Sequence, residues 1–244
     1  NKRWINSIDV ETVELDLGTA RQAVQSNLDK ELTPDNLAGV TPLVKQLQYR
    51  DQRRRQRYTK ALEGVEIVIH CGGLTSARNE DEFMAVNAAG TAELAKAASA
   101  AGVARFIYIS SLAARGPDGA SGPVTPYGRS KLLGERLLEE NKGDMTTVVL
   151  RPGGIYGARD SALLPLFQMA TRGWMIVPRS EVPLQPVYVS DVVTATIAAI
   201  DAPTVDKPVE IAGVQKHRWE DLAQVVGAAV GVGVRVVRVP MAFL

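Results

Sequence analysis

The residues best suited to chemistry are Tyr127 and Lys131, four positions apart in the stretch Pro126-Tyr-Gly-Arg-Ser-Lys131. In a helix, side chains with this spacing lie one turn apart on the same face. A lysine ammonium in that place favours the phenolate, so we expect it to lower the tyrosine pKa from its usual value of about 10. A phenol tuned in this way can exchange a proton with a substrate oxygen near neutral pH.

The segment before this pair supports a catalytic interpretation. Arg105-Phe-Ile-Tyr-Ile-Ser-Ser111 is rich in β-branched and aromatic residues, which is typical of a strand, and it ends in two serines. A loop rich in glycine and proline, residues 115–126, leads into the helix. The Tyr-x-x-x-Lys spacing alone would fit an exposed helix with a solvated lysine equally well. A strand-end hydroxyl followed by the pair indicates a catalytic site.

Strands and helices alternate on both sides of this stretch, and this order predicts βαβ units with a parallel sheet. The first half contains a strand at 65–70, a helix capped by Asn79 and running to 101, a strand at 104–110, a helix at 126–141 and a strand at 145–150. The second half contains a helix at 161–172, an apolar patch at 174–177, a short strand at 186–190, a helix starting at Asp191, a strand at 209–212, a helix at 218–230 and a strand at 234–239.

Composition narrows the class of protein. A chain of 244 residues fits one domain, or one domain with a small appendage. The net charge of +1 gives no reason to expect nucleic acid as a partner, and the basic run at 50–57 is interpreted as a solvated helix face. One cysteine fits a reducing, cytoplasmic location. We expect no membrane span. The chain opens without methionine or a signal peptide, which suggests a start inside a longer gene product.

Several short motifs occur in a specific order over residues 61–240. They are Val-Ile-His-Cys-Gly-Gly (68–73), Val-Asn-Ala-Ala-Gly-Thr (86–91), Ile-Ser-Ser (109–111), Tyr-Gly-Arg-Ser-Lys (127–131), Leu-Arg-Pro-Gly-Gly-Ile-Tyr-Gly (150–157) and Val-Tyr-Val-Ser-Asp-Val (187–192). As a set they resemble the extended short-chain dehydrogenase/reductase family, which includes nucleoside-diphosphate-sugar epimerases and 3β-hydroxysteroid dehydrogenases. The resemblance implies an α/β fold: a Rossmann-like, doubly wound parallel sheet with a small C-terminal substrate region.

The resemblance also implies roles for the three chemical residues. Tyr127 matches the catalytic acid/base, and Lys131 matches the residue that bonds the nicotinamide ribose and lowers the tyrosine pKa. Ser111 matches the hydroxyl that polarises the substrate oxygen. We prefer it to Ser110, because strand alternation turns Ser110 to the other face.

The implied cofactor is NAD or NADP, and no metal is expected. Tyr127 and Lys131 would contact it, together with residues matched from three other places. Asp16 and Leu17 resemble a strand-end pair that contacts adenine, Cys71, Gly72 and Gly73 match a loop packed on the cofactor, and Pro152 and Gly153 match the backbone under the nicotinamide.

Four nearby polar residues have plainer explanations, which we favour. His70 is interpreted as a core histidine with its hydrogen bonds satisfied, and Cys71 as a small buried filler. Asn87 is expected to bridge a helix and a strand, and Asp191 to cap a helix.

The glycine-rich dinucleotide fingerprint of the family does not occur in this sequence. If residues 10–17 form the family's third strand, we expect the first strand, the first helix and the second strand to be missing or rewritten, and the pyrophosphate cradle to be lost with them. We therefore divide the chain into an atypical polar segment (1–60), a Rossmann-like core (61–157) and a C-terminal substrate region (158–244). A truncated or rearranged product, a partner chain that supplies the missing part, and a diverged binding protein all fit this pattern.

The expected function is NAD(P)-dependent oxidation, reduction or epimerisation of a small molecule at a secondary alcohol or ketone, sterol-like or nucleotide-sugar-like. The alternative is a non-catalytic binding or interaction protein that has lost its cofactor site. An incomplete sheet exposes a strand edge, so we also expect marginal stability, self-association or a partner chain that covers the edge.

Overall fold

The computed structural model describes residues 58–117, 119, 122–158, 160, 163–179, 184–203 and 205–240. The predicted strand at 10–17, with Asp16 and Leu17, lies outside these residues, as does the basic run at 50–57.

Four parallel strands form the central sheet, in the order β1-β2-β3-β7. They are β1 (Ile67–His70), β2 (Arg105–Ile109), β3 (Thr146–Pro152) and β7 (Val209–Ile211). In the register of the sheet, His70 stands beside Tyr108 and Ile109 beside Leu150. The carboxyl ends of β1, β2 and β3 therefore meet at one edge, where the predicted catalytic residues follow the strands.

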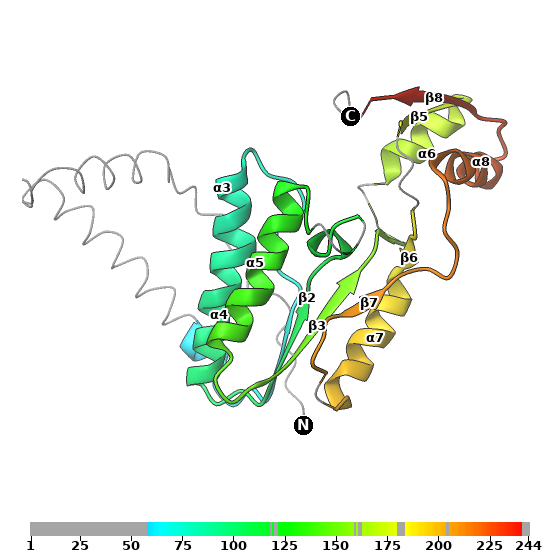
Figure 1. Cartoon of the computed structure of the whole chain (residues 1–244). Coiled ribbons are helices and arrows are strands. Elements are labelled where there is room, and N and C mark those ends of the chain that lie inside the picture. Colours follow the sequence, from blue (N-terminus) through cyan, green and yellow to red (C-terminus); the bar gives the residue numbers. More distant parts are fainter. Residues whose placement is uncertain are drawn as a thin grey trace, which may run out of the picture.

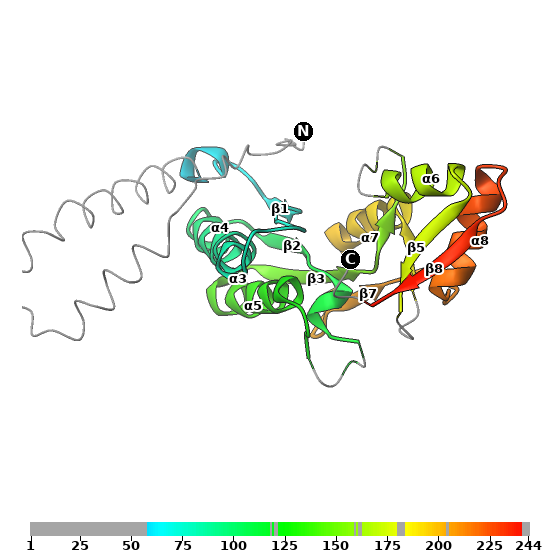
Figure 2. The ribbon, with the colours of Figure 1, turned by 90° about the horizontal axis from the view of Figure 1, so that it is seen from above.

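Helices cover both faces of this sheet, as Figures 1 and 2 show. One face carries a continuous helical segment made of α3 (Glu80–Phe83), the π-helix η1 (Met84–Ala89) and α4 (Gly90–Ala100), and beside it α5 (Pro126–Asn141). The other face carries α7 (Val189–Asp201). The Arg105 guanidinium ties α7 to β2, because it donates to the carbonyls of Ala199 (2.9 Å) and Ala202 (2.8 Å) at the helix end.

The strand β2 is buried on both faces, and its run of apolar residues accounts for this burial. Phe106 and Tyr108 pack with Ala95, Ala98 and Leu138 of α4 and α5. The intervening Ile107 packs on the opposite side with Val148, Leu150 and Ala199. Phe106, Ile107 and Tyr108, the three middle residues of β2, are fully buried. The fold class predicted from the sequence, an α/β parallel sheet of the Rossmann type, is confirmed.

A smaller unit follows in the C-terminal half, at the upper right of Figure 1. It consists of α6 (Leu164–Thr171), β5 (Trp174–Pro178), α8 (Trp219–Ala229) and β8 (Arg235–Val239). The strands β5 and β8 pair in parallel, and Met175, Val177, Ala170, Ala223 and Val226 form its core. The sequence indicated β5 only as an apolar patch, because a run of four apolar residues does not separate strand from buried helix.

Two short elements join the sheet to this unit. The strand β4 (Ile155–Tyr156) follows β3, and β6 (Val187–Tyr188) precedes α7. The two strands pair in parallel. The helix α7 begins at Val189, so Asp191 lies in its first turn, and the prediction that Asp191 caps the helix is wrong. Among the described residues, no helix combines the length and apolar character needed to cross a bilayer.

The helix predicted from Asn79 to residue 101 forms, but with an irregular middle. Asn79 caps it as expected, since its side chain accepts a hydrogen bond from the N–H of Glu82 at 2.9 Å. Gly102 follows the end of α4 with φ of +75°, a conformation that glycine adopts without strain. Between these ends, Met84–Ala89 widens into a π-helix that contains the fully buried Asn87. Such bulges are frequent at functional sites.

Candidate active site

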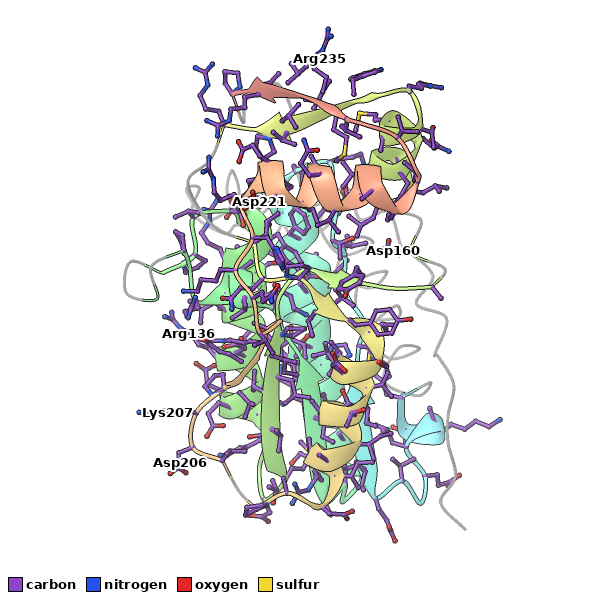
Figure 3. The ribbon with its side chains drawn as sticks, turned by 90° about the vertical axis from the view of Figure 1, so that its right-hand side faces the viewer. Arg136, Asp160, Asp206, Lys207, Asp221 and Arg235 are labelled. Atoms are coloured by element: carbon purple, nitrogen blue, oxygen red, sulfur yellow. The ribbon has the colours of Figure 1, made fainter. Side chains whose placement is uncertain are left out.

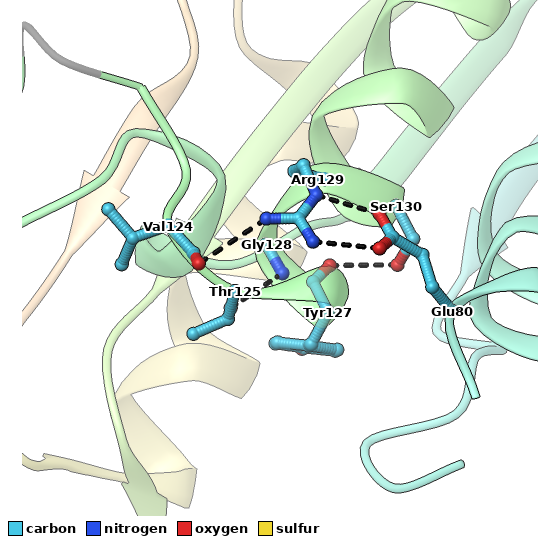
Figure 4. Close-up of polar contacts among 7 residues, drawn as sticks. All are labelled: Glu80, Val124, Thr125, Tyr127, Gly128, Arg129 and Ser130. Carbon is cyan, nitrogen blue, oxygen red and sulfur yellow. Dashed lines mark hydrogen bonds and ion pairs between the residues drawn. The ribbon is translucent and has the colours of Figure 1, made fainter. Parts of the chain in front are cut away.

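The start of α5 is built to bring Tyr127 against the end of β2. Thr125 caps the helix by accepting from the N–H of Gly128 at 3.0 Å (Figure 4). Pro126 occupies the first turn. Gly128 lies so close to the short helix at residues 112–114 that an added Cβ would stand 2.4 Å from the Ala113 carbonyl oxygen. A glycine is required here because any side chain would push α5 away from the loop that follows Ser111.

The Ser111 hydroxyl lies near enough to the Tyr127 phenol to favour its ionised form. Ser111 caps the short 3-10 helix η2 (Leu112–Ala114), and its hydroxyl accepts from the N–H of Ala113 at 3.2 Å. The Tyr127 ring is half-buried and packs edge-on against Phe83, with ring centroids 5.9 Å apart. Two hydroxyl groups are thus held together at the carboxyl end of β2.

Lys131 lies one turn further along α5 and is almost completely buried, with 4% of its surface exposed. Its ammonium donates to the carbonyl of Ile109 at 2.8 Å and lies 4.3 Å from the centre of the Tyr108 ring. Burial lowers the pKa of Lys131 to about 8, against the opposing effect of Glu135. This lysine is therefore a partly desolvated cation at the end of the sheet.

The expected lowering of the tyrosine pKa is wrong for this arrangement. Burial raises the pKa of Tyr127, and the nearby Ser111 hydroxyl offsets only part of the rise. The reason is geometric: the Lys131 ammonium is directed to Ile109 and the face of Tyr108, so the causes acting on Tyr127 are desolvation and the Ser111 hydroxyl.

A buried acidic residue, Glu135, adds a contact network that the sequence did not indicate. It lies one turn beyond Lys131, and its carboxylate receives two bonds from the Arg151 guanidinium, at 2.9 and 2.5 Å. The Ser110 hydroxyl also donates to it. Ser110 therefore points toward Glu135, whereas the Ser111 hydroxyl lies at the start of η2 near Tyr127. The Tyr127, Lys131 and Glu135 spacing of four residues was the signal that could have revealed this third member.

Asn87 holds the site together from the π-helix. Its amide donates to the Leu74 carbonyl and to the Ser130 hydroxyl, each at 3.0 Å, and accepts from the Leu74 N–H at 2.7 Å. Ser130 in turn donates to the Tyr127 carbonyl at 2.8 Å, as Figure 4 shows. Asn87 thus bridges two segments by hydrogen bonds as expected, but the segments are α5 and the loop after β1.

A second contact fixes α3 to the start of α5. The Arg129 guanidinium makes a two-pronged ion pair with Glu80, with distances of 2.7 and 2.8 Å, and also donates to the Val124 carbonyl (Figure 4). Both side chains are about 40% exposed, so the pair orients the helices and contributes little to stability.

The loop Cys71, Gly72 and Gly73 runs past Lys131 at the end of β1, and all three residues are exposed. A Cβ on Gly73 would stand 2.9 Å from the Asn87 Oδ1 atom and 3.7 Å from the Lys131 Nζ atom. The backbone therefore comes as near to Lys131 as the chain allows, which fits a flat ligand lying on this loop. The expectation that Cys71 is a buried filler is wrong, because the residue lies past the last paired position of β1.

Two other predicted cofactor residues, Pro152 and Gly153, lie at the carboxyl end of β3. Pro152 is buried at the end of β3, and the Gly153 N–H donates to the Ile211 carbonyl at 2.8 Å. A Cβ on Gly153 would stand 2.7 Å from the Gln185 carbonyl oxygen and 3.4 Å from Leu112. The loops after β1, β2 and β3 therefore surround one region with Tyr127 and Lys131 between them. This arrangement fits the nicotinamide end of a dinucleotide.

His70 takes the structural role expected of it. Its Nε2 atom bonds the Thr91 hydroxyl at 2.9 Å, and its ring stacks on Tyr108. Burial lowers the pKa of His70 to about 4, with the Lys131 charge adding to the effect, so the imidazole is neutral at pH 7. Among the described residues, no group of three or more His, Cys, Asp or Glu is arranged to hold a metal ion.

Comparison with known proteins agrees with this geometry. The sequence profile of the NAD dependent epimerase/dehydratase family matches residues 11–212. The chain belongs to this family. The resemblance to extended short-chain dehydrogenases inferred from the motifs is thereby confirmed, and the family is one of NAD-dependent enzymes.

Two curated relatives are similar over much of the chain. A ceramide reductase of Caulobacter vibrioides is 33% identical over 181 residues, which is 73% of this chain and 54% of the relative. The human sterol-4-alpha-carboxylate 3-dehydrogenase, decarboxylating, is 32% identical over 133 residues, 48% of this chain and 36% of the relative. This epimerase/dehydratase family member thus spans about half the length of the first of these relatives.

A solved structure supports the same assignment. A short-chain dehydrogenase/reductase superfamily protein from Agrobacterium tumefaciens, with bound NAD, is 27% identical and superposes with a TM-score of 0.63. The match covers 76% of this chain and 71% of that one. The parallel sheet with helices on both faces is therefore the family's fold.

Proposed function

We propose that this chain is part of an NAD- or NADP-dependent oxidoreductase that interconverts a secondary alcohol and a ketone. The observation that carries the proposal is the close contact of α5 with the loop after β2, which brings Tyr127 beside Ser111 with the buried Lys131 one turn away on α5. Hydroxyl groups that converge at the ends of parallel strands are suited to hold a substrate oxygen.

In the proposed mechanism, the substrate oxygen lies between the Ser111 and Tyr127 hydroxyl groups. Ser111 donates a hydrogen bond that polarises the carbonyl, and Tyr127 transfers its phenolic proton to the oxygen as negative charge develops there. The nicotinamide, when bound, supplies or accepts the hydride at the carbon. In the oxidative direction Tyr127 takes the proton instead.

Lys131 has two tasks in this proposal. Its ammonium would donate to the cofactor ribose, for which the nearby exposed Gly72 and Gly73 leave space. It also stabilises the phenolate that Tyr127 becomes during the transfer, which requires the ammonium to turn from the Ile109 carbonyl. Desolvation strengthens both effects, because the side chain is buried.

The raised pKa of Tyr127 favours a second candidate, a binding protein with the fold of the family and no turnover. Such a protein would keep the described loops and lack the tuned phenol. For both candidates we propose a cytoplasmic location, supported by the single cysteine.

Titration calorimetry with NAD, NADH, NADP and NADPH tests the proposal, and also decides which cofactor is used. We expect binding of one of the two pairs, weakened in Lys131→Ala and nearly unchanged in Tyr127→Phe. Absence of binding at millimolar concentrations of all four dinucleotides would exclude the oxidoreductase and leave the binding protein.

A further inference from the structure

A closed set of contacts around Glu135, here called the Glu135 network, joins α5 to the carboxyl ends of β2 and β3. The Glu135 carboxylate accepts a hydrogen bond from the Ser110 hydroxyl and two from the Arg151 guanidinium, at 2.9 and 2.5 Å. The Ser110 N–H donates to the carbonyl of Leu150, the residue before Arg151, at 2.7 Å. Three elements that carry the proposed catalytic and cofactor residues are therefore tied together at one place.

The Glu135 network is buried and closely packed. Ser110 is 4% exposed and Glu135 is 8% exposed. A Cβ on Gly134 would stand 2.7 Å from the Tyr108 hydroxyl oxygen, so α5 approaches β2 as closely as a glycine allows. This approach brings Glu135 within reach of the short serine side chain. Arg136, the next residue of α5, is exposed and lies at the edge of the molecule in Figure 3.

The network fixes the peptide unit that receives the Lys131 ammonium. The ammonium donates to the Ile109 carbonyl at 2.8 Å, and this carbonyl belongs to the same planar peptide unit as the Ser110 N–H. That N–H is bonded to β3, and the Ser110 side chain is bonded to Glu135. The carbonyl therefore cannot turn away from Lys131 without breaking a contact of the network.

The charges of the network are balanced within it. Glu135 and Arg151 form a two-pronged pair, with 7% and 14% of their side chains exposed, so their opposite charges largely offset each other at longer range. Glu135 still favours the charged form of Lys131, but its effect on the pKa of Lys131 is smaller than that of burial. What the network gives to Lys131 is therefore mainly a fixed position.

We propose that Glu135 is a positioning residue for the reaction. Through Ser110 and Arg151 it holds the Ile109 carbonyl, and with it the Lys131 ammonium, at the place from which the lysine reaches the cofactor ribose and Tyr127. The inference rests on the proposed function, in which Lys131 makes these two contacts. It also separates the tasks of two adjacent serines, since Ser111 holds the substrate oxygen and Ser110 supports the lysine.

Exchange of the Lys131 ammonium protons with water tests the positioning without any cofactor. In the full chain labelled with ¹⁵N-lysine, NMR measures this exchange at a pH well below the Lys131 pKa of about 8, and loss of the signal in Lys131→Met assigns it. Ser110→Ala keeps both charges of the buried pair, so we expect it to speed exchange by about three- to tenfold only by releasing the acceptor. Glu139→Gln, at an exposed position of the same helix, is the control and should leave exchange unchanged.

Two double variants separate position from charge. Glu135→Met with Arg151→Met removes both charges of the pair together, so that no buried charge is left without a partner if the single Glu135→Gln variant does not fold. Glu135→Gln with Arg151→Met is equally neutral but keeps an oxygen that can accept from Ser110. We expect the first to exchange its Lys131 protons about three- to tenfold faster than the second. Equal rates in the two double variants, or an unchanged rate in Ser110→Ala, would overturn the proposal.

Dinucleotide affinity, measured by titration calorimetry, reports on the proposed function separately. We expect Ser110→Ala to weaken binding by about three- to tenfold and Glu139→Gln to leave it unchanged. Faster exchange in Ser110→Ala, with no dinucleotide binding by the unsubstituted chain, would support the hold of Glu135 on Lys131 and contradict the oxidoreductase. Dinucleotide binding with unchanged exchange in Ser110→Ala would support the oxidoreductase and contradict the role of Glu135.

Discussion

At the scale of single residues, the site combines groups whose ionisation is set by burial. Burial shifts the pKa values of Lys131, Tyr127 and His70 in the direction that favours the neutral form of each side chain, and desolvation is the largest cause. Groups with displaced pKa values that converge at the end of a sheet are typical of functional sites. Substitutions of Tyr127, of Lys131 and of its neighbour Glu135 test this description of the site.

Removing the Tyr127 hydroxyl should separate proton transfer from binding. In Tyr127→Phe the ring still packs on Phe83, so we expect kcat to fall by about 10²–10⁴-fold while dinucleotide affinity stays nearly intact. Steady-state kinetics and calorimetry measure the two quantities. Tyr58→Phe, in the first described helix, is the control. An unchanged kcat would remove Tyr127 from the mechanism.

Replacing the buried lysine by an apolar side chain should stabilise the protein. The pKa of Lys131, lowered from 10.5 to about 8, corresponds to about 3 kcal/mol of unfavourable free energy for its charged form. Lys131→Met loses the bond to Ile109 but removes this term, so we expect the free energy of unfolding at pH 7 to rise by about 1–3 kcal/mol.

The pH dependence of that gain has a definite sign. The unfolded chain binds the lysine proton more tightly than the folded chain, so wild-type stability increases as the pH rises from about 8 to 10.5. The advantage of Lys131→Met should therefore shrink across this window and stay constant below it. Urea unfolding at several pH values measures it, and a gap that widens above pH 8 would contradict the argument.

Glu135 offers a third test, because its carboxylate bonds Arg151 and its negative charge favours the charged form of Lys131. Glu135→Gln leaves the Arg151 guanidinium, of which only 14% is exposed, without its counter-charge, so we expect a loss of about 3–5 kcal/mol of stability. The pKa of Lys131 should fall further. Glu139→Gln, one turn along on the exposed side, should change stability by less than about 0.5 kcal/mol. Equal losses in the two variants would show that the buried pair is unimportant.

At the scale of elements, the position of α5 depends on the absence of a side chain at residue 128. Gly128→Ala would place a methyl group 2.4 Å from the Ala113 carbonyl oxygen, so α5 and η2 must separate. We expect a loss of about 1–3 kcal/mol and of activity, because this contact holds Tyr127 of α5 beside Ser111 at the start of η2.

Gly90→Ala is the matched control for this prediction. Residue 90 is also helical, but the nearest atom to an added Cβ is 3.7 Å away, which is ordinary contact. We expect this variant to gain about 0.5–1 kcal/mol from helix propensity. Thermal unfolding and ketone reduction measure both variants. Similar behaviour of the two would mean that close packing at Gly128 is not required.

The sequence predicted the regular elements well where local signals were complete. The helix α5 was expected at 126–141 and forms there, since Thr125 and Pro126 define its start. The π-helix around Asn87 was missed because an apolar repeat does not encode an extra residue in one turn. The pair of Glu135 and Arg151 was missed because its members lie on different elements, and their proximity depends on the register of α5 against β3. Cys71 was assigned to the interior because small residues usually fill cores.

At the scale of the whole molecule, the described sheet has four strands, and within the described residues β1 pairs with β2 alone. The strand carries apolar residues on both faces, and such an edge invites pairing with another chain. The prediction of a homo-oligomer, a partner chain or marginal stability therefore stays open, as does the division of the chain at residues 60 and 157.

Size-exclusion chromatography with light scattering, together with thermal unfolding, tests that prediction. We expect the isolated chain to self-associate, or to unfold at a temperature below the range that is usual for mesophile domains. The reason is that a central strand of a doubly wound sheet is normally stabilised by a neighbour on each side. A monodisperse monomer with a cooperative transition at about 45–65 °C would mean that this chain completes the sheet by itself.

The exposed Cys71 is a site for attaching a fluorescent label. It is the sole cysteine of the 244 residues, and it precedes the two glycines that approach Lys131. A fluorophore attached to this thiol would stand at the entrance to the proposed nicotinamide site with no engineered residue. Its emission would follow the arrival of ligands directly, whether or not a hydride is ever transferred.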